Sequence, residues 1–329
     1  MGAAALAVLA ALAIVLVLQL RGSDEPVRQA TAAEAPGAAA LTDPQHRDTT
    51  WSRIDHVDAM RPLPADAKDD RPAFYDDGSG CQVKDGDPVP KVCASGDPSG
   101  DRTLMLVGDS KLAQWQTAFD DLGRADGFTV LTATKSACPF TDAAVTSDRK
   151  VRTDCREWGQ AALRDTLEAR PDVVVTSQRT STALLDDGSD RTRGAMIRGL
   201  HSYWSQLQDA GIEVVVMLDN PFPITHPVYQ CVEEHPDDLP RCSFDLAEGV
   251  QKSSAPMMRE AAEIMSGVGI IDMTSTICPD EGRCPAVIGN VLVYRAGSHI
   301  TKTFVRTAEP QLAVELARAT GGTFGETGP

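Results

Sequence analysis

The chain has 329 residues, 42% of them hydrophobic and 24% charged, which is enough for one large domain with a buried core. Its net charge of −16 argues against nucleic acid or an anionic membrane surface as a partner, because phosphate binding needs clustered lysines and arginines and the sequence has no such block. Aromatic residues make up only 5% of the chain, which also argues against a platform for stacked bases.

The N-terminal residues 2–20 carry no charge and would span about 28 Å as a helix, close to the hydrocarbon thickness of a bilayer. No lysine or arginine precedes them, and Arg21 follows where a cleaved leader needs small residues. The pattern therefore favours a transmembrane helix or signal anchor at 1–20 over a cleaved signal peptide. Arg21 and Arg28 would favour a cytoplasmic C-terminal side. The cysteines discussed below favour an exterior domain instead. Membrane helices upstream of this segment would set its orientation and so remove this conflict.

Residues 21–74 are rich in Ala, Pro, Asp and Thr and have no helical or strand periodicity, so they are predicted to be a linker that buries no core. The stretch 75–100, which contains two cysteines and many Gly, Pro and Asp residues, is predicted to fold back on the main domain as an N-terminal extension. This domain is expected to cover 75–320, and 321–329 to be a flexible tail.

Eight cysteines occur as four close pairs along the chain, and we expect each to bond to its nearest neighbour: Cys81 to Cys93, Cys138 to Cys155, Cys231 to Cys242, and Cys278 to Cys284. An even number of cysteines behind a hydrophobic N-terminal segment is typical of an oxidising, extracytoplasmic compartment. The spacing contains no Cys-x-x-Cys pair and no matching pair of histidines, which argues against a zinc site. The expected location is the cell membrane, with a single anchor and the domain outside.

Between 103 and 320 the pattern alternates between strands and helices. Apolar or β-branched runs predict strands at 103–108, 128–134, 172–177, 212–218 and 268–273. Helices are predicted at 111–124, 156–169, 193–210, 249–266 and 302–319. Alternation with short connections implies an α/β fold whose parallel sheet is covered on both faces, with five strands in the order 2-1-3-4-5.

The first strand ends in Gly108, Asp109 and Ser110, which puts Ser110 at the carboxyl end of a strand, where α/β sheets bind ligands. A plain helix N-cap made by Asp109 is the alternative interpretation of the same residues. His299 lies in the last loop before the closing helix and can meet Ser110 above the sheet. A base of this kind is required, because a free hydroxyl is a poor nucleophile at neutral pH. Lys111 could hold an anionic group, although a solvated first-turn lysine is the favoured interpretation.

Several short motifs between Pro62 and Leu316 follow one another in an order that is found in a known protein family. They are Tyr75-Asp-Asp-Gly with Cys81, Leu106-Val-Gly-Asp-Ser110 with Trp115, Thr134-Lys-Ser-Ala-Cys138-Pro, Cys155-Arg-Glu-Trp158, Pro171-Asp-Val-Val-Val, and Cys278-Pro through Cys284 and Tyr294 to His299-Ile-Thr. Together they resemble the SGNH/GDSL hydrolases, in particular the extracytoplasmic domains associated with membrane acyltransferases that O-acylate surface glycans. Two positions depart from that family. Lys111 stands where a His usually follows the nucleophile, and Ala296 where an Asp usually precedes the catalytic His.

The resemblance implies a three-layer, flavodoxin-like SGNH fold, with Ser110 as nucleophile and His299 as base. The oxyanion donors would be the Ser110 amide and groups at the ends of the second and third strands, for which Ser136, Gln178 and Arg179 hold comparable positions. With Ala296 in place of the acid, a backbone carbonyl or another carboxylate has to orient His299.

The function implied is O-acyl transfer, with acetyl as the expected group, from a membrane acyltransferase of the same or a neighbouring polypeptide to a surface carbohydrate. No cofactor and no metal are expected. Two alternatives stay open at this point: hydrolysis of acyl esters by the same residues, and a non-catalytic glycan-binding module, which the exchanges at Ala296 and Lys111 make credible.

Overall fold

The computed structural model describes residues 27–325 except 77, 149, 225 and 226. The predicted membrane segment at 1–20 therefore lies outside the described residues. Within the described part of the chain, no helix is both long and apolar enough to cross a bilayer.

A central sheet is formed by all five expected strands, which are β5 (Arg102–Gly108), β6 (Phe128–Lys135), β9 (Val173–Thr176), β12 (Glu213–Met217) and β14 (Val268–Ile271). They pair in parallel in the order β6-β5-β9-β12-β14, which is 2-1-3-4-5 when these five strands are numbered along the chain. The predicted count of five strands is wrong. Two short strands from the N-terminal extension join β6, with β3 (Gln82–Val83) parallel to it and β4 (Cys93–Gly96) antiparallel.

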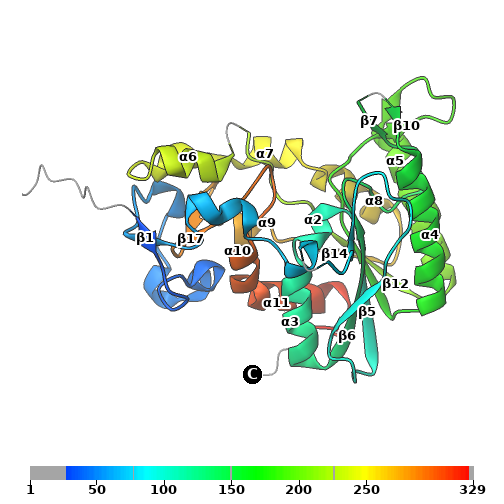
Figure 1. The fold of residues 1–329 in the computed structure, drawn as a ribbon, viewed down its shortest axis with the longest axis horizontal. Helices are drawn as coiled ribbons and strands as arrows, with labels where there is room; N and C mark the ends of the chain where they lie inside the picture. Colours follow the sequence, from blue (N-terminus) through cyan, green and yellow to red (C-terminus); the bar gives the residue numbers. More distant parts are fainter. Residues whose placement is uncertain (1–26, 77, 149, 225–226, 326–329) are drawn as a thin grey trace, which may run out of the picture.

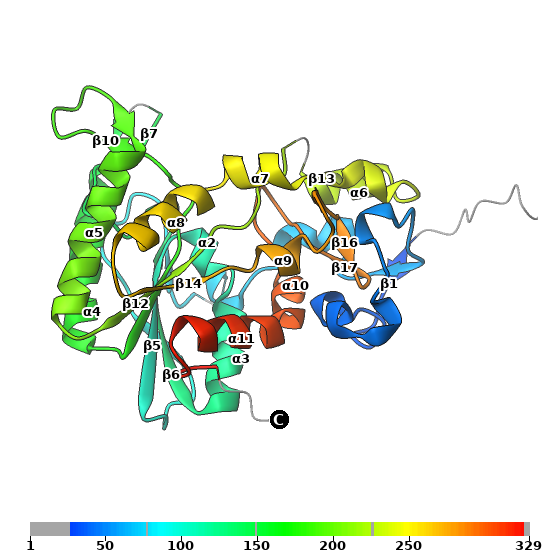
Figure 2. The same ribbon diagram turned by 180° about the vertical axis from the view of Figure 1, so that it is seen from behind.

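The sheet is buried on both faces, as the apolar runs of its strands require. In β5, Leu104 and Leu106 belong to one hydrophobic cluster and Met105 and Val107 to the other, because successive side chains of a strand point to opposite faces. Figures 1 and 2 show the two helical layers that cover these faces. One layer contains α3 (Gln116–Asp126), α10 (Lys302–Thr307) and α11 (Glu309–Ala319), and the other α4 (Thr153–Ala169), α5 (Arg193–Asp209) and α8 (Ala255–Ile264).

Three predicted helices are each divided in two. The first consists of α2 (Ser110–Ala113) and α3, the fourth of α7 (Leu246–Lys252) and α8, and the fifth of α10 and α11. Pro256 and Pro310 are the second residues of α8 and α11. Proline fits the first turn, whose amides have no partner within the helix, but it interrupts a helix interior. The divisions at these two prolines follow from that rule.

The segment 27–74 packs against the body, so its interpretation as a linker without a core is wrong for these residues. Its small side chains Ala30, Ala35, Ala38 and Ala40 are buried. The segment contains two short strands, β1 (Arg28–Gln29) and β2 (Ala59–Met60), and four short 3₁₀ helices, η1 (Gly37–Thr42), η2 (Pro44–His46), η3 (Trp51–Arg53) and η4 (Pro64–Asp69). A fifth 3₁₀ helix, η5 (Ala73–Tyr75), begins in it and ends one residue beyond it. Such short elements leave no periodicity for sequence analysis to detect.

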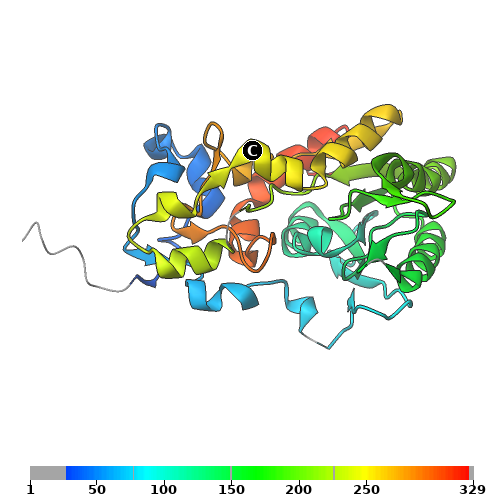
Figure 3. The same ribbon diagram turned by 90° about the horizontal axis from the view of Figure 1, so that it is seen from above.

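This segment belongs to a second lobe beside the α/β body (Figures 1 and 3). The lobe also contains α6 (Val228–Glu234), η6 (Leu239–Cys242), β16 (Val287–Ile288) and β17 (Val291–Leu292). The remaining elements are β7 (Thr146–Ser147), β8 (Lys150–Val151), β10 (Ala183–Leu184), β11 (Arg191–Thr192), β13 (Phe244–Asp245), α9 (Thr274–Ile277) and β15 (Arg283–Cys284).

Near the C-terminus, residues 321–325 also pack rather than form a flexible tail. Phe324 is fully buried, and its ring lies edge-on to Phe128 with 5.0 Å between the centroids. Residues 326–329 lie outside the described part of the chain.

The four expected disulfides are present, Cys81–Cys93, Cys138–Cys155, Cys231–Cys242 and Cys278–Cys284. Each closes a short loop, and by the loop-entropy argument each contributes on the order of 2–3 kcal/mol to stability.

Candidate functional site

Ser110 is the first residue of α2, and Asp109 alone separates it from the end of β5. The turn requires glycine at 108, because a Cβ there would lie 2.4 Å from the carbonyl oxygen of Ser177. Asp109 is the N-cap, and it is fully buried. One of its carboxylate oxygens accepts from the Lys111 amide at 2.8 Å, and the other from the Arg179 amide at 2.9 Å. Burial raises the pKa of Asp109 to about 6. Asp109 therefore fixes the nucleophile's turn to the end of the neighbouring strand.

His299 meets Ser110 above the sheet, with 2.9 Å between its Nε2 and the serine Oγ. Its Nδ1 lies 3.2 Å from the carbonyl oxygen of Ala296. A carbonyl can only accept, so this contact places the proton of the neutral ring on Nδ1 and leaves Nε2 to accept from the Ser110 hydroxyl. The backbone carbonyl of Ala296 thus occupies the role that an acid three residues before the histidine would fill.

The loop of His299 is held at both ends. The Arg295 amide donates to the His299 carbonyl at 2.9 Å, and a β-bridge joins Tyr294 to Ile300. Thr301 then caps α10 through its hydroxyl, which accepts from the Phe304 amide at 3.1 Å. This short hairpin fixes the imidazole relative to α10.

The pKa of His299 is lowered to about 3, first by burial and then by the nearby cations Lys111, Arg295 and Arg179. The imidazole is therefore neutral at physiological pH and is available as a proton acceptor.

We expect kcat/KM for an acetyl ester to stay constant from about pH 8 down to about pH 5 and to fall only as the pH approaches the lowered pKa of His299. The contribution of His299 to stability follows the same direction. The unfolded chain takes up this proton near pH 6.5 and the folded chain only near 3, so this contribution to the free energy of unfolding decreases as the pH falls between these values, whereas that of Asp109, whose pKa is raised to about 6, increases below pH 6. A pH–rate profile checks the prediction, and a half-loss of activity near pH 6.5 would contradict it.

Lys111 is neither solvated nor open to a ligand, so both interpretations made from the sequence are wrong. Its side chain is fully buried, and its Nζ lies 2.9 Å from a carboxylate oxygen of Asp219. It also donates to Asn220 Oδ1 and to the backbone carbonyl of Ser298, both at 2.8 Å. Burial lowers the pKa of Lys111, and Asp219 opposes that effect. This lysine therefore joins the nucleophile's helix to the loop that carries His299.

Gln114 and Asn220 complete this connection, and sequence analysis did not assign Gln114 to the site. The side chain of Gln114 accepts from the Ile300 amide at 2.9 Å and donates to Asn220 Oδ1 at 3.0 Å. The side-chain Nδ2 of Asn220 donates to the Ser298 carbonyl at 2.8 Å. Gln114 follows Ser110 by four residues, and that spacing on one helical face is the signal that could have identified it.

Apart from the Ser110 amide, the groups considered as oxyanion donors already have other acceptors within the described residues. The Ser136 amide donates to the Val83 carbonyl at 2.9 Å, and the Gln178 side chain donates to the Thr180 carbonyl at 2.6 Å. The Arg179 amide bonds to Asp109, while its guanidinium lies 5.2 Å from the centre of the Phe222 ring. The structure therefore brings Ser110, Lys111, His299 and the backbone of Arg179 together, but it engages Ser136 and Gln178 elsewhere.

Comparisons with known proteins agree with this architecture. The family model described as an SGNH domain fused to AT3 domains matches residues 80–314. The structure is similar to the periplasmic domain of a lipopolysaccharide acetyltransferase from Salmonella ser. Paratyphi A, with 14% identity and a TM-score of 0.50 over 67% of this chain and 85% of that one. It is also similar to a GDSL-like lipase from Bacteroides thetaiotaomicron, with 13% identity and a TM-score of 0.39 over 66% and 89%. At such identities the likeness concerns the fold alone. No curated protein matches the sequence.

Proposed function

Because the chain belongs to the family of SGNH domains that are fused to AT3 domains, we propose that it transfers an acyl group to a hydroxyl of a surface carbohydrate through an ester on Ser110. The similar periplasmic domain belongs to a lipopolysaccharide acetyltransferase, which supports acyl transfer as the reaction. The observation that carries the proposal is the contact of 2.9 Å between Ser110 Oγ and a neutral, oriented His299.

In the first step, the Ser110 oxygen attacks the carbonyl carbon of the donor ester while His299 Nε2 takes the hydroxyl proton. The bond from the acyl carbon to the donor oxygen breaks, and that oxygen takes the proton back from the imidazolium. In the second step, a sugar hydroxyl loses its proton to His299 and attacks the Ser110 ester. Ser110 leaves with the proton that His299 now carries, so both residues return to their initial state.

Water competes with the sugar for the same intermediate, which makes ester hydrolysis the alternative reaction of this site. His299 is only partly buried, and solvent reaches the edge of the site. A slow hydrolysis in the absence of acceptor is therefore part of the proposal.

The proposed donor is a membrane acyltransferase, which the fusion to AT3 domains in this family supports. The four disulfides support a location outside the cytoplasm, where they form and persist. The uncharged segment 2–20 would then anchor the chain in the membrane, close to the source of the acyl group.

Incubation of the protein with nitrophenyl acetate and a mixture of oligosaccharides tests the proposal. We expect acetylated sugar in the mass spectrum with the wild-type chain and none with Ser110→Ala, whereas the exposed-site control Ser147→Ala should behave as wild type. Release of acetate without any acetylated sugar would favour hydrolysis. No turnover together with an unmodified Ser110 would favour a glycan-binding module.

A further inference from the structure

Three lysine or arginine side chains are buried among the described residues: Lys111, Lys135 and Arg295. Lys111 pairs with Asp219 at 2.9 Å, and Lys135 pairs with Asp154 at 3.1 Å. Arg295 is 6% exposed, yet no carboxylate of the described chain lies within 4 Å of its guanidinium, and its Nε has no hydrogen-bond partner there. An unpaired buried cation is costly, so this guanidinium is a place where an anion would be stabilised.

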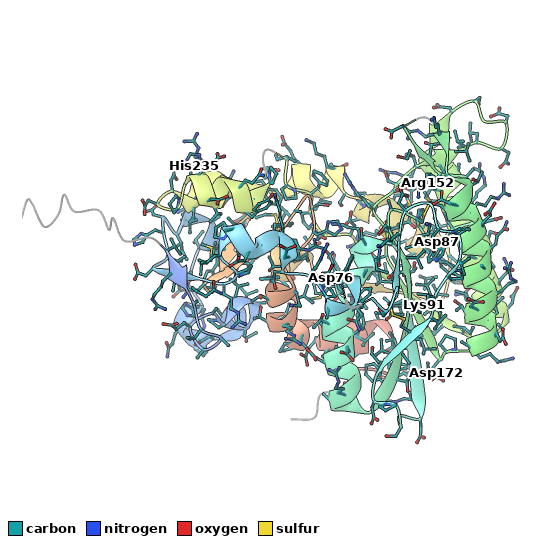
Figure 4. All side chains as sticks on the ribbon, viewed as in Figure 1. Asp76, Asp87, Lys91, Arg152, Asp172 and His235 are labelled. Carbon is teal, nitrogen blue, oxygen red and sulfur yellow. A yellow bond between two sulfur atoms is a disulfide. The ribbon has the colours of Figure 1, made fainter. Side chains whose placement is uncertain are left out.

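Arg295 lies beside the reacting groups. Its amide donates to the carbonyl of His299 at 2.9 Å, and its charge is one of those that lower the pKa of that imidazole. The guanidinium lies 6.0 Å from the ring centre of Tyr75. Figure 4 labels the next residue, Asp76, between the α/β body and the second lobe. Asp70 is the carboxylate that acts most strongly on the pKa of Arg295. It already accepts a hydrogen bond from the amide of Thr303 at 2.9 Å.

Arg179 provides a second guanidinium that is near enough to act electrostatically on His299. Its amide is bonded to Asp109, the neighbour of Ser110, and its charge also lowers the pKa of His299. The side chain is exposed and lies over Phe222, and it makes no ion pair within the described residues. In a protein with a net charge of −16, the charged groups that act most strongly on His299 are therefore all cations.

We propose that Arg295 and Arg179 form a subsite for an anionic oxygen group, a carboxylate or a phosphate, on the carbohydrate that receives the acyl group. This inference rests on the proposed function and adds to it the class of acceptor, an acidic glycan. Guanidinium groups bind both anions through pairs of charge-assisted hydrogen bonds, and such bonds are strongest where water is excluded, as around Arg295.

Binding to the Ser110→Ala variant, measured by calorimetry with glucuronate, glucose 6-phosphate and glucose, tests the subsite. At least one of the two anionic sugars should bind about tenfold more tightly than glucose, as expected for one charge-assisted contact. Selectivity for glucuronate would identify a uronic acid acceptor, and selectivity for glucose 6-phosphate a phosphorylated one. Equal affinity for all three sugars would overturn the subsite.

Added in the same background, Arg295→Met and Arg179→Gln should each remove this selectivity, whereas the control Arg124→Gln, in a surface ion pair on α3, should retain it. Arg295→Met should melt no earlier than its parent, because an unpaired buried cation is replaced by an apolar side chain of similar length. A large fall in its melting temperature would make Arg295 a structural group and overturn the proposal.

Because Ser110→Ala forms no acyl ester, this binding assay does not depend on the reaction. Selective binding together with a wild-type Ser110 that is never acylated would overturn the proposed acyl transfer alone. Equal binding together with an acylated Ser110 would overturn the anionic subsite alone.

Discussion

The variants Ser110→Ala and His299→Ala should each have a kcat/KM for an acetyl ester that is lower by about a thousandfold or more. The kcat/KM of the double variant should be no lower than that of either single variant. The reason is that the two side chains act as one unit, joined at 2.9 Å. Without the imidazole the hydroxyl keeps its proton, and without the hydroxyl the imidazole has nothing to activate.

Steady-state kinetics of the three variants measure this effect, and Ser147→Ala on the exposed hairpin provides the control. The melting temperatures should all stay close to that of the wild type, since neither the Ser110 nor the His299 side chain is part of the hydrophobic core. Additive losses in the double variant would mean that the two residues act separately, and full activity of Ser110→Ala would move the nucleophile elsewhere.

Lys111→Met should lower the free energy of unfolding by about 3–5 kcal/mol, because it leaves the carboxylate of Asp219 buried without its counter-charge. The same change should reduce activity, since it removes the bonds from Nζ to Asn220 and to the Ser298 carbonyl that connect α2 to the loop of His299. Denaturant titration measures the first effect and ester turnover the second.

The double variant Lys111→Met with Asp219→Asn should recover part of the stability, because no uncompensated charge is left. Lys302→Met is the matched control. Its ammonium is partly exposed and lies 3.9 Å from Asp70, so its loss should cost less than about 1 kcal/mol. A Lys111→Met protein as stable as Lys302→Met would show that the buried pair does not hold the site together.

Much of the fold follows from local patterns in the sequence. The five main strands are apolar runs that can only be buried on both faces, and the disulfides join the cysteines nearest along the chain. Ser110 and His299 could be predicted because each follows a strand and precedes a helix, the positions that bring side chains together at one edge of a parallel sheet.

The features that could not be predicted from the sequence depend on contacts between residues that are far apart along the chain. A lysine in the first turn of a helix has the same local pattern whether it is solvated or buried, and only the fold brings Asp219 to Lys111. The orienting group of His299 is a backbone carbonyl, and no residue type marks such a group. The segment 27–74 packs through alanines in short 3₁₀ helices, which have neither the length nor the periodicity of a recognisable element.

In the proposed reaction Ser110 carries the acyl group and His299 activates its hydroxyl. Mass spectrometry of the tryptic peptide 103–111, after brief reaction with nitrophenyl acetate and acid quenching, tests it directly, because Thr103 and Ser110 are the only hydroxyl residues in that peptide. We expect one acetyl group, assigned by fragmentation to Ser110 in the wild type and missing in His299→Ala. An unmodified peptide from a protein that turns over the ester, or an acetyl group on another residue that does not require His299, would contradict it.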